Sequence, residues 1–243
     1  MIPNKIYADF LSLVVETCAY AGSGNVLKVQ KMLHLCAEHK KEEKDALSQI
    51  AAVLGVALIA FGEDISQDMC LRTMNHLLQY GEPNIKRIVP LAIGLLRISN
   101  PDVSIMDMLT KLSYDSDANI AMSAIFALGL IGAGTNNSRI AGNLRYLAAY
   151  YANNADQLFV VRISQGLVHL GKGLLTLNPL YSDKFLFSNV SLAGLLTVLY
   201  TCTDMKTFLV GKYHYFLYYL VLSIYPRMLI AVSIFIYPKH EYS

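Results

Sequence analysis

The sequence repeats one kind of apolar stretch at nearly constant intervals, and this regularity constrains the fold more than any other feature. The clearest copy runs from Ala124 to Gly134, consists mainly of small and aliphatic residues, and ends in two glycines two positions apart. Similar stretches recur on both sides of it at intervals of 40, 35, 35 and 39 residues. Their register positions are Thr17, Ala57, Ala92, Ala127 and Gly166. A period of this length over most of a chain is typical of a solenoid.

Each apolar stretch also carries signals for the two ends of a helix. Acidic residues stand ten positions before three of the register positions, in turn-like clusters. They are Glu82, Asp117 and Asp156. A carboxylate there can accept hydrogen bonds from the free amides of a helix start and oppose its dipole. Glycine at the other end predicts a left-handed helix-stopping residue, for example at Gly132 and Gly171. The first unit departs from this pattern, because Tyr7 takes the equivalent place and its acid is Asp9.

The fold class that follows is all-α, with an α-solenoid segment of helix–turn–helix repeats. We expect four to five repeats and no strand before residue 180. Pro90 should kink or break its helix, because proline lacks the amide hydrogen and clashes with the preceding turn. The mixed-charge run from 38 to 45 reads as a solvated connection. The expected helices cover 6–21, 26–34, 46–61, 64–80, 85–98, 105–112, 119–131, 139–151 and 157–170.

The register loosens after Gly173, so we divide the chain into a repeat array over 1–200 and an apolar C-terminal segment over 201–243. Residues 191–196 look like a fifth copy at a shorter spacing. Residues 207–238 are apolar and aromatic, but Lys212 and Arg227 leave uncharged runs of only 14 and 11 residues. A bilayer crossing needs about 18 to 20 residues. We therefore expect a packed helix pair or an edge strand there.

Composition limits the classes of function. The chain is 54% hydrophobic and 16% charged, which is apolar for a soluble protein. Inner helices covered on both sides would give this composition, and so would a membrane protein. The formal net charge of +2 is too balanced to indicate nucleic acid or a lipid surface as a partner.

No residue pattern in the sequence indicates a catalytic site, a cofactor or a metal site. The sequence also does not indicate which residues bind a partner, so the binding residues are unknown. The cysteines show no metal-ligand spacing, and we interpret them as reduced thiols in a cytosolic or nuclear protein. His34 and Glu38 share a helix face but lack further ligands nearby. Asp115 and Asp117 could form an acid–base pair, although turn and cap roles explain them better. The four cysteines are Cys18, Cys36, Cys70 and Cys202.

The stretch from Ala127 to Asn137 resembles the proteasome/cyclosome repeat. The resemblance extends over about residues 6 to 230. In detail, the sequence is similar to the large scaffold subunits of the proteasome regulatory particle. The departures from the family pattern are a start in the middle of the array, a short charged insertion at 38–45, and the missing C-terminal domain of the family. The stretches that carry the resemblance are 18–30, 79–83, 165–173 and 214–229.

The resemblance implies a segment of an α-helical toroid that acts as a non-catalytic scaffold in the base of the regulatory particle. Implied partners are the proteasome base ATPase subunits and other regulatory-particle subunits, in the cytoplasm and nucleus. Ubiquitin-like shuttle factors would bind parts of the family toroid that this chain does not match. Nucleic acid is not an expected partner. Two other interpretations stay open, a small membrane-associated helical protein and a non-functional fragment.

The ends of the array carry one further expectation. A solenoid repeat buries its apolar face only against its neighbours. The first helix, over 6–21, and the apolar segment over 213–237 have no polar capping repeat beside them. We therefore expect exposed apolar faces and self-association of the isolated chain.

Overall fold

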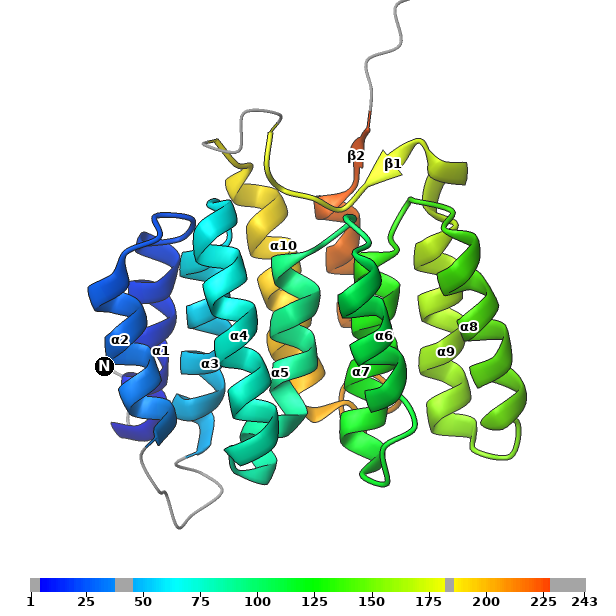
Figure 1. Ribbon diagram of the computed structural model, residues 1–243, viewed down its shortest axis with the longest axis horizontal. Coiled ribbons are helices and arrows are strands. Elements are labelled where there is room, and N and C mark those ends of the chain that lie inside the picture. Colours follow the sequence, from blue (N-terminus) through cyan, green and yellow to red (C-terminus); the bar gives the residue numbers. More distant parts are fainter. Residues whose placement is uncertain (1–4, 38–45, 182–185, 228–243) are drawn as a thin grey trace, which may run out of the picture.

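The chain folds into helical hairpins that stand side by side in one row (Figure 1). The computed structural model describes residues 5–37, 46–181 and 186–227. The predicted all-α class is confirmed, and most helix boundaries agree with the sequence pattern to within two residues. The helices are α1 (Lys5–Ala19), α2 (Val26–Ala37), α3 (Ala46–Ala60), α4 (Asp64–Tyr80), α5 (Pro83–Leu96), α6 (Val103–Leu112), α7 (Ala118–Ile131), α8 (Ser138–Tyr150), α9 (Ala155–Val168) and α10 (Asn189–Thr201). Three 3-10 helices, η1 (Leu170–Gly173), η2 (Cys202–Asp204) and η3 (His214–Ser223), and two strands, β1 (Leu175–Thr176) and β2 (Tyr225–Pro226), complete the described chain.

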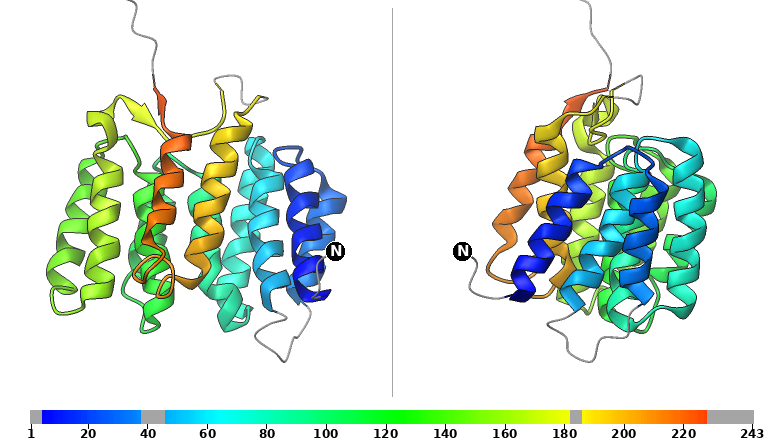
Figure 2. Two further views of the ribbon diagram at one scale, coloured as in Figure 1. Left: turned by 180° about the vertical axis from the view of Figure 1, so that it is seen from behind. Right: turned by 90° about the vertical axis from the view of Figure 1, so that its left-hand side faces the viewer.

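Odd-numbered and even-numbered helices form two layers. Each helix from α1 to α7 in the odd layer packs against the next odd helix, and the even helices α2, α4, α6 and α8 each pack on an odd helix from the outside. Figure 2 shows these layers from behind and from the side. The odd helices contain the predicted apolar stretches, so the repeat period corresponds to one odd helix and its even partner.

The central odd helices are apolar around their whole circumference because neighbours cover them on every side. Every residue of α7 from Ile120 to Ile131 is buried, and so is every residue of α3 from Ala51 onward. The two end helices, α1 and α9, have an odd neighbour on one side only. Burial of apolar surface at about 25 cal/mol per Å² therefore stabilises the middle of the row most.

Small residues allow the odd helices to approach closely. A Cβ atom on Gly94 of α5 would lie 3.2 Å from the Cβ of Ala127 on α7. A Cβ atom on Gly129 of α7 would lie 2.8 Å from the Cα of Ser164 on α9. The Ser164 hydroxyl donates a hydrogen bond of 2.9 Å to the carbonyl oxygen of Ile125 across the same contact. The small residues of the repeat are thus packing contacts between successive units.

The C-terminal part forms a third layer on the face of the odd helices that lies away from the even helices (Figure 2). There α10 packs along η3, and the ring of Phe10 on α1 meets the ring of Tyr200 on α10 edge to face at 5.7 Å between centroids. The predicted fifth copy at 191–196 is helical, but it belongs to this layer. The prediction of a fifth copy there is wrong, because α10 packs along η3 in this layer and does not add an odd helix to the row.

Two further predictions about the backbone are corrected. A short strand does precede residue 180, since β1 pairs antiparallel with β2, with Leu175 opposite Pro226. Of the kink or break predicted at Pro90, the break is excluded, because α5 continues through Pro90, which is buried. No helix among the described residues is long and apolar enough to cross a bilayer. The charged run at 38–45 and the segment after 227 lie outside the described residues.

The predicted helix caps are right at one of three positions. The Asp117 side chain accepts a hydrogen bond from the backbone N–H of Asn119 and caps α7. Glu82 is the N-cap residue of α5 but makes no capping hydrogen bond with its side chain. Asp156 lies inside the first turn of α9, where Asn154 is the N-cap residue. The latter two acids are close to a helix start and can still oppose its dipole.

One of the two predicted left-handed glycines is confirmed, and the other stands two residues before the left-handed residue of its turn, Gly134. Gly132 caps α7 with φ of −80°, so the prediction for this glycine is wrong, while Gly171 has φ of 56° as predicted. The left-handed position lies three residues after the last helical residue of α1, α5, α7 and α9. The residues at that position are Gly22, Ser99, Gly134 and Gly171.

Candidate binding site

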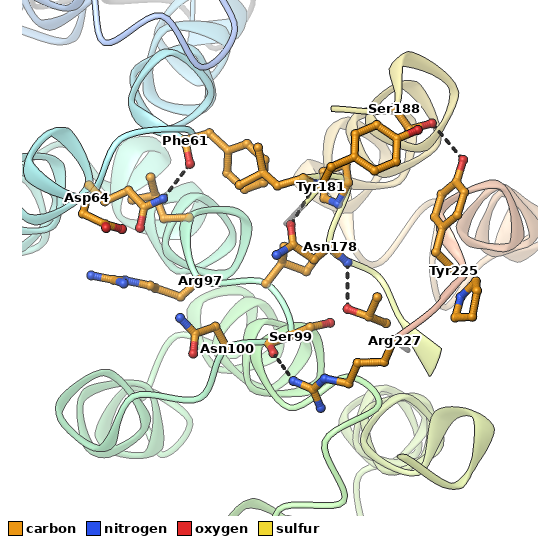
Figure 3. Close-up of a pocket in the computed structure, with 17 residues that line it drawn as sticks. Phe61, Asp64, Arg97, Ser99, Asn100, Asn178, Tyr181, Ser188, Tyr225 and Arg227 are labelled. Atoms are coloured by element: carbon orange, nitrogen blue, oxygen red, sulfur yellow. Dashed lines mark hydrogen bonds between the residues drawn. The ribbon is translucent and has the colours of Figure 1, made fainter. Parts of the chain in front are cut away.

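A cavity of about 690 Å³ opens where the row of hairpins meets the C-terminal segment. It lies at the edge of the row at which α3 and α5 end and β1 and β2 pair (Figures 1 and 3). This volume is in the range of small-molecule and peptide sites. The lining residues are Phe61, Asp64, Gln67, Leu96, Arg97, Ile98, Ser99, Asn100, Thr176, Asn178, Pro179, Leu180, Tyr181, Ser188, Tyr225, Pro226 and Arg227.

Ser99 is the central residue of the cavity wall. It follows α5 in a left-handed conformation, with φ of 54°, and is buried. Its carbonyl oxygen accepts a hydrogen bond of 3.2 Å from Arg227 (Figure 3). Its hydroxyl oxygen accepts one of 3.1 Å from the backbone N–H of Leu177. A side-chain hydroxyl is needed for the second bond, which explains serine at a position where α1, α7 and α9 have glycine.

The two arginines of the cavity have different roles. Arg227 donates hydrogen bonds to the carbonyl oxygens of Ser99 and Gly134, so it ties the end of the third layer to the ends of α5 and α7. Arg97 pairs through one terminal nitrogen with Asp68 at 2.8 Å. The Nε atom of Arg97 is buried and has no hydrogen-bond partner among the described residues.

The cavity presents polar groups that can take part in binding. The described residues of its lining supply two guanidinium groups, carboxamides and one carboxylate, Asp64, and include no cysteine, histidine or lysine. The hydroxyls of Ser188 and Tyr225 hydrogen-bond each other at 2.8 Å. A nucleophilic hydroxyl needs an adjacent base, and among the described lining residues there is no histidine or lysine to serve Ser99 or Ser188. The cavity can accommodate a polar, peptide-like group.

The residues considered for chemistry from the sequence have structural roles. Asp115 accepts a hydrogen bond from the backbone N–H of Asp117, which in turn caps α7 and pairs with Arg87 at 3.2 Å, so the turn-and-cap interpretation is confirmed. No group of three or more His, Cys, Asp or Glu in the described part of the chain could hold a metal ion. His169, which the apolar helix pattern indicated as a core histidine, is instead the exposed residue after α9 and contacts Asn136.

All four cysteines are free thiols, as predicted. Cys18 is exposed, whereas Cys36, Cys70 and Cys202 are buried. Burial raises the pKa of each of these three buried thiols to about 12. A thiol with so high a pKa is a poor nucleophile near neutral pH.

The sequence did not predict the cavity. Its residues come from four separate segments, and Arg227 contacts a carbonyl 128 positions earlier in the chain. The only local signal is at Ser99, where Ser99-Asn100-Pro101 takes the place of the glycines that end the other odd helices.

The row of helical hairpins and the repeated small residues define an α-solenoid repeat protein, and the comparisons place it among such proteins. The model of the proteasome/cyclosome repeat matches residues 123–157, which contain α8 and most of α7. The chain belongs to the proteasome/cyclosome-repeat family.

Within this family the chain is similar to one subunit of the 26S proteasome. It is 55% identical over 230 residues to the 26S proteasome non-ATPase regulatory subunit 2 homolog A of Arabidopsis thaliana, which covers 95% of the chain. It is 52% identical to the non-ATPase regulatory subunit 2 of Dictyostelium discoideum over 93% of the chain. The regulatory subunit rpn-1 of Neurospora crassa is 50% identical over 91% of the chain. The chain spans about a quarter of the length of these relatives, 26%, 25% and 25% in that order.

Proposed function

We propose that the chain acts as a non-catalytic scaffold and interaction segment in the base of the proteasome regulatory particle. The observation that carries this proposal is the 55% identity over 95% of the chain to a non-ATPase regulatory subunit. A row of close-packed hairpins suits such a role, because each unit presents its outer helix and connecting loops while the inner helices remain buried. Through this scaffold the chain supports ubiquitin-dependent protein degradation and regulates the proteasome.

The partners proposed are the ATPase subunits of the base and other regulatory-particle subunits, in the cytoplasm and nucleus. In the proposed division the repeat array over 1–200 supplies the scaffold and 201–243 is an apolar segment, of which η3 packs on α10 at the end of the array. Ubiquitin-like shuttle factors would bind parts of the relatives that this chain does not span. A membrane-associated protein is the less favoured interpretation, since the relatives are proteasome subunits.

Affinity purification of the tagged chain from its native cell tests this proposal. We expect mass spectrometry to identify the proteasomal ATPases and other base subunits in the purified material. Recovery of the folded chain with none of these subunits would contradict it. Carbonate extraction of membranes provides a second readout, because a membrane-embedded protein stays in the pellet.

A further inference from the structure

The turn after α3 is shorter than the turns that follow the other odd helices of the hairpins. Only three residues, 61–63, separate α3 from α4. The turns from α1 to α2, from α5 to α6 and from α7 to α8 contain six residues each, at 20–25, 97–102 and 132–137. Each longer turn has a left-handed residue three positions after its odd helix ends. In the short turn that position is Glu63, which is extended, with φ of −118°, and is already the N-cap residue of α4.

The short turn leaves one contact of the row unmade. Each longer turn donates a backbone hydrogen bond to the end of the next odd helix, from Gly22 to Leu58 of α3, from Ser99 to Leu130 of α7 and from Gly134 to Leu167 of α9. Among the described residues, the turn after α3 makes no such bond to α5. A Cβ atom on Gly62 would lie 2.9 Å from the carbonyl oxygen of Gly22, so the short turn packs on the α1 side. The end of α5 therefore lacks the backbone contact that α3, α7 and α9 receive.

The cavity of about 690 Å³ opens at this same place. Its wall includes Phe61 from the short turn and Leu96 from the end of α5. Leu96 is the last residue of α5, and the last carbonyl groups of a helix have no partner within that helix. The cavity therefore occupies the space in which a longer turn would bring backbone N–H groups to α5.

The opposite wall of the cavity carries a positive charge. The guanidinium of Arg227 donates to two carbonyl oxygens, which are uncharged, and it forms no ion pair with any residue that the structure describes. The one carboxylate of the described lining, Asp64, lies on the other side of the cavity from Arg227 (Figure 3). A carboxylate is the acceptor that binds a guanidinium most strongly, so this end of the cavity favours an acidic group.

We propose that the cavity binds an extended peptide segment of another protein, and that this segment carries an acidic side chain. The backbone N–H groups of the segment donate to the end of α5, as the longer turns do elsewhere in the row, and its carboxylate pairs with Arg227. A stretch of main chain is what the short turn omits, so a peptide backbone is the chemistry that replaces it. Main-chain hydrogen bonds combined with a side-chain contact are a general mode of peptide recognition. This inference concerns the purified chain and does not rest on the proposed function.

A fluorescence titration tests the proposal. The chain contains no tryptophan, so Tyr181→Trp, at an exposed residue of the cavity wall, provides a single reporter. The probe is the synthetic peptide acetyl-Thr-Asp-Val-Asp-Thr-amide, whose β-branched residues favour an extended backbone. We expect a saturable change of tryptophan fluorescence with the probe in the millimolar range. The absence of any saturable change would overturn the proposal.

Two altered probes on the same protein test the two contacts separately. The first has N-methyl groups on its backbone nitrogens and so lacks the N–H donors, and the second has lysine in place of both aspartates. Each should bind at least about tenfold more weakly than the acidic probe, because it loses a hydrogen bond or a charge-assisted contact. Equal binding of either altered probe would contradict the proposal. These comparisons require no further substitution in the protein.

A substitution that fills the cavity locates the binding. Asn100 is an exposed lining residue whose side chain makes no hydrogen bond within the described part of the chain. Asn100→Phe should weaken binding of the acidic probe by at least about tenfold. Asn153→Phe is the matched control, because Asn153 is also exposed and lies in the turn between α8 and α9, at the opposite edge of the row (Figure 1). It should bind as the parent does. Undiminished binding by an Asn100→Phe variant with the parent's melting temperature would place the probe elsewhere and overturn the proposal.

Discussion

The backbone N–H of Gly134 donates a hydrogen bond of 3.0 Å to the carbonyl oxygen of Leu167, and this bond joins the end of α7 to the end of α9. The same link joins Gly22 to Leu58 at 2.9 Å and Ser99 to Leu130 at 3.1 Å. The last carbonyl groups of a helix have no partner within that helix. In this fold the left-handed residue after one odd helix supplies the partner for the next, so successive repeats are connected by backbone as well as by side chains.

Replacement of Gly134 by alanine should destabilise the chain by about 2 kcal/mol or more. The residue has φ of 66°, where an L-residue is strained, and a Cβ would collide with the backbone carbonyl of Leu175. Urea unfolding measures the loss. Gly142→Ala is the control, because that position is open, and it should be neutral or slightly stabilising. Equal losses for the two variants would contradict the role assigned to the left-handed residue.

Replacement of Gly129 by alanine should cost about 1–2 kcal/mol. The new Cβ would lie 2.8 Å from the Cα of Ser164, and overpacking of this kind outweighs the gain in helix propensity. The matched change Gly166→Ala meets open space and should stabilise by up to about 1 kcal/mol. Thermal melts of both variants give the comparison. A stabilised Gly129→Ala variant would show that α7 and α9 can separate without cost.

Two variants of Asp117 distinguish the contribution of a helix cap to the free energy of unfolding from that of an ion pair. Asp117→Ala removes both the cap of α7 and the pair with Arg87, and should cost about 1 kcal/mol. Asp117→Asn retains a good capping side chain and loses only a partly exposed ion pair, which is worth less than about 0.5 kcal/mol. If the asparagine variant were as unstable as the alanine variant, the ion pair and not the cap would dominate.

Much of the row could be predicted from the sequence, because its determinants are local. The segment from Asp64 to Tyr80 is helical over the predicted range, since a helix depends on side chains three and four positions apart. The period between odd helices follows from the small residues that their close packing requires. The Asp117 cap follows likewise from a turn immediately before an apolar helix.

The third layer and the cavity depend on contacts that local patterns do not contain. Ser99 and Arg227 meet only because α10 and η3 fold back over the odd helices. Gly132 and Gly134 both follow α7, and the sequence pattern could not tell which of the two adopts the left-handed conformation. The hydrogen bond from Gly134 to α9 explains why it is Gly134 and not the predicted Gly132. Packing between distant segments therefore decided the details that the periodicity left open.

Stability should fall in alkaline solution through the buried thiols. Burial raises the pKa of Cys36, Cys70 and Cys202 to about 12 in the folded chain, above the ordinary value of 9.0 that applies on unfolding. The unfolded chain therefore loses these protons first. The associated stability is complete below pH 9 and is lost progressively between about pH 9 and 12.

Urea unfolding at pH 7.5 and at pH 10.5 measures this effect. A chain with all three buried cysteines changed to alanine will be less stable at both pH values, because cavities are created, but its stability should fall less between them. An identical fall in the parent and in the triple variant would show that other groups control the alkaline transition.

Native gel electrophoresis of cell extracts tests the central claim, that this chain is a working scaffold segment of the proteasome regulatory particle. The extract should contain the tagged chain at its natural level, and the gel should be stained for proteasome peptidase activity and then probed for the tag. We expect the tag in the peptidase-active bands that contain the regulatory particle, and a weaker signal there for the destabilised Gly134→Ala variant. A folded wild-type chain that migrates only apart from those bands would contradict the account.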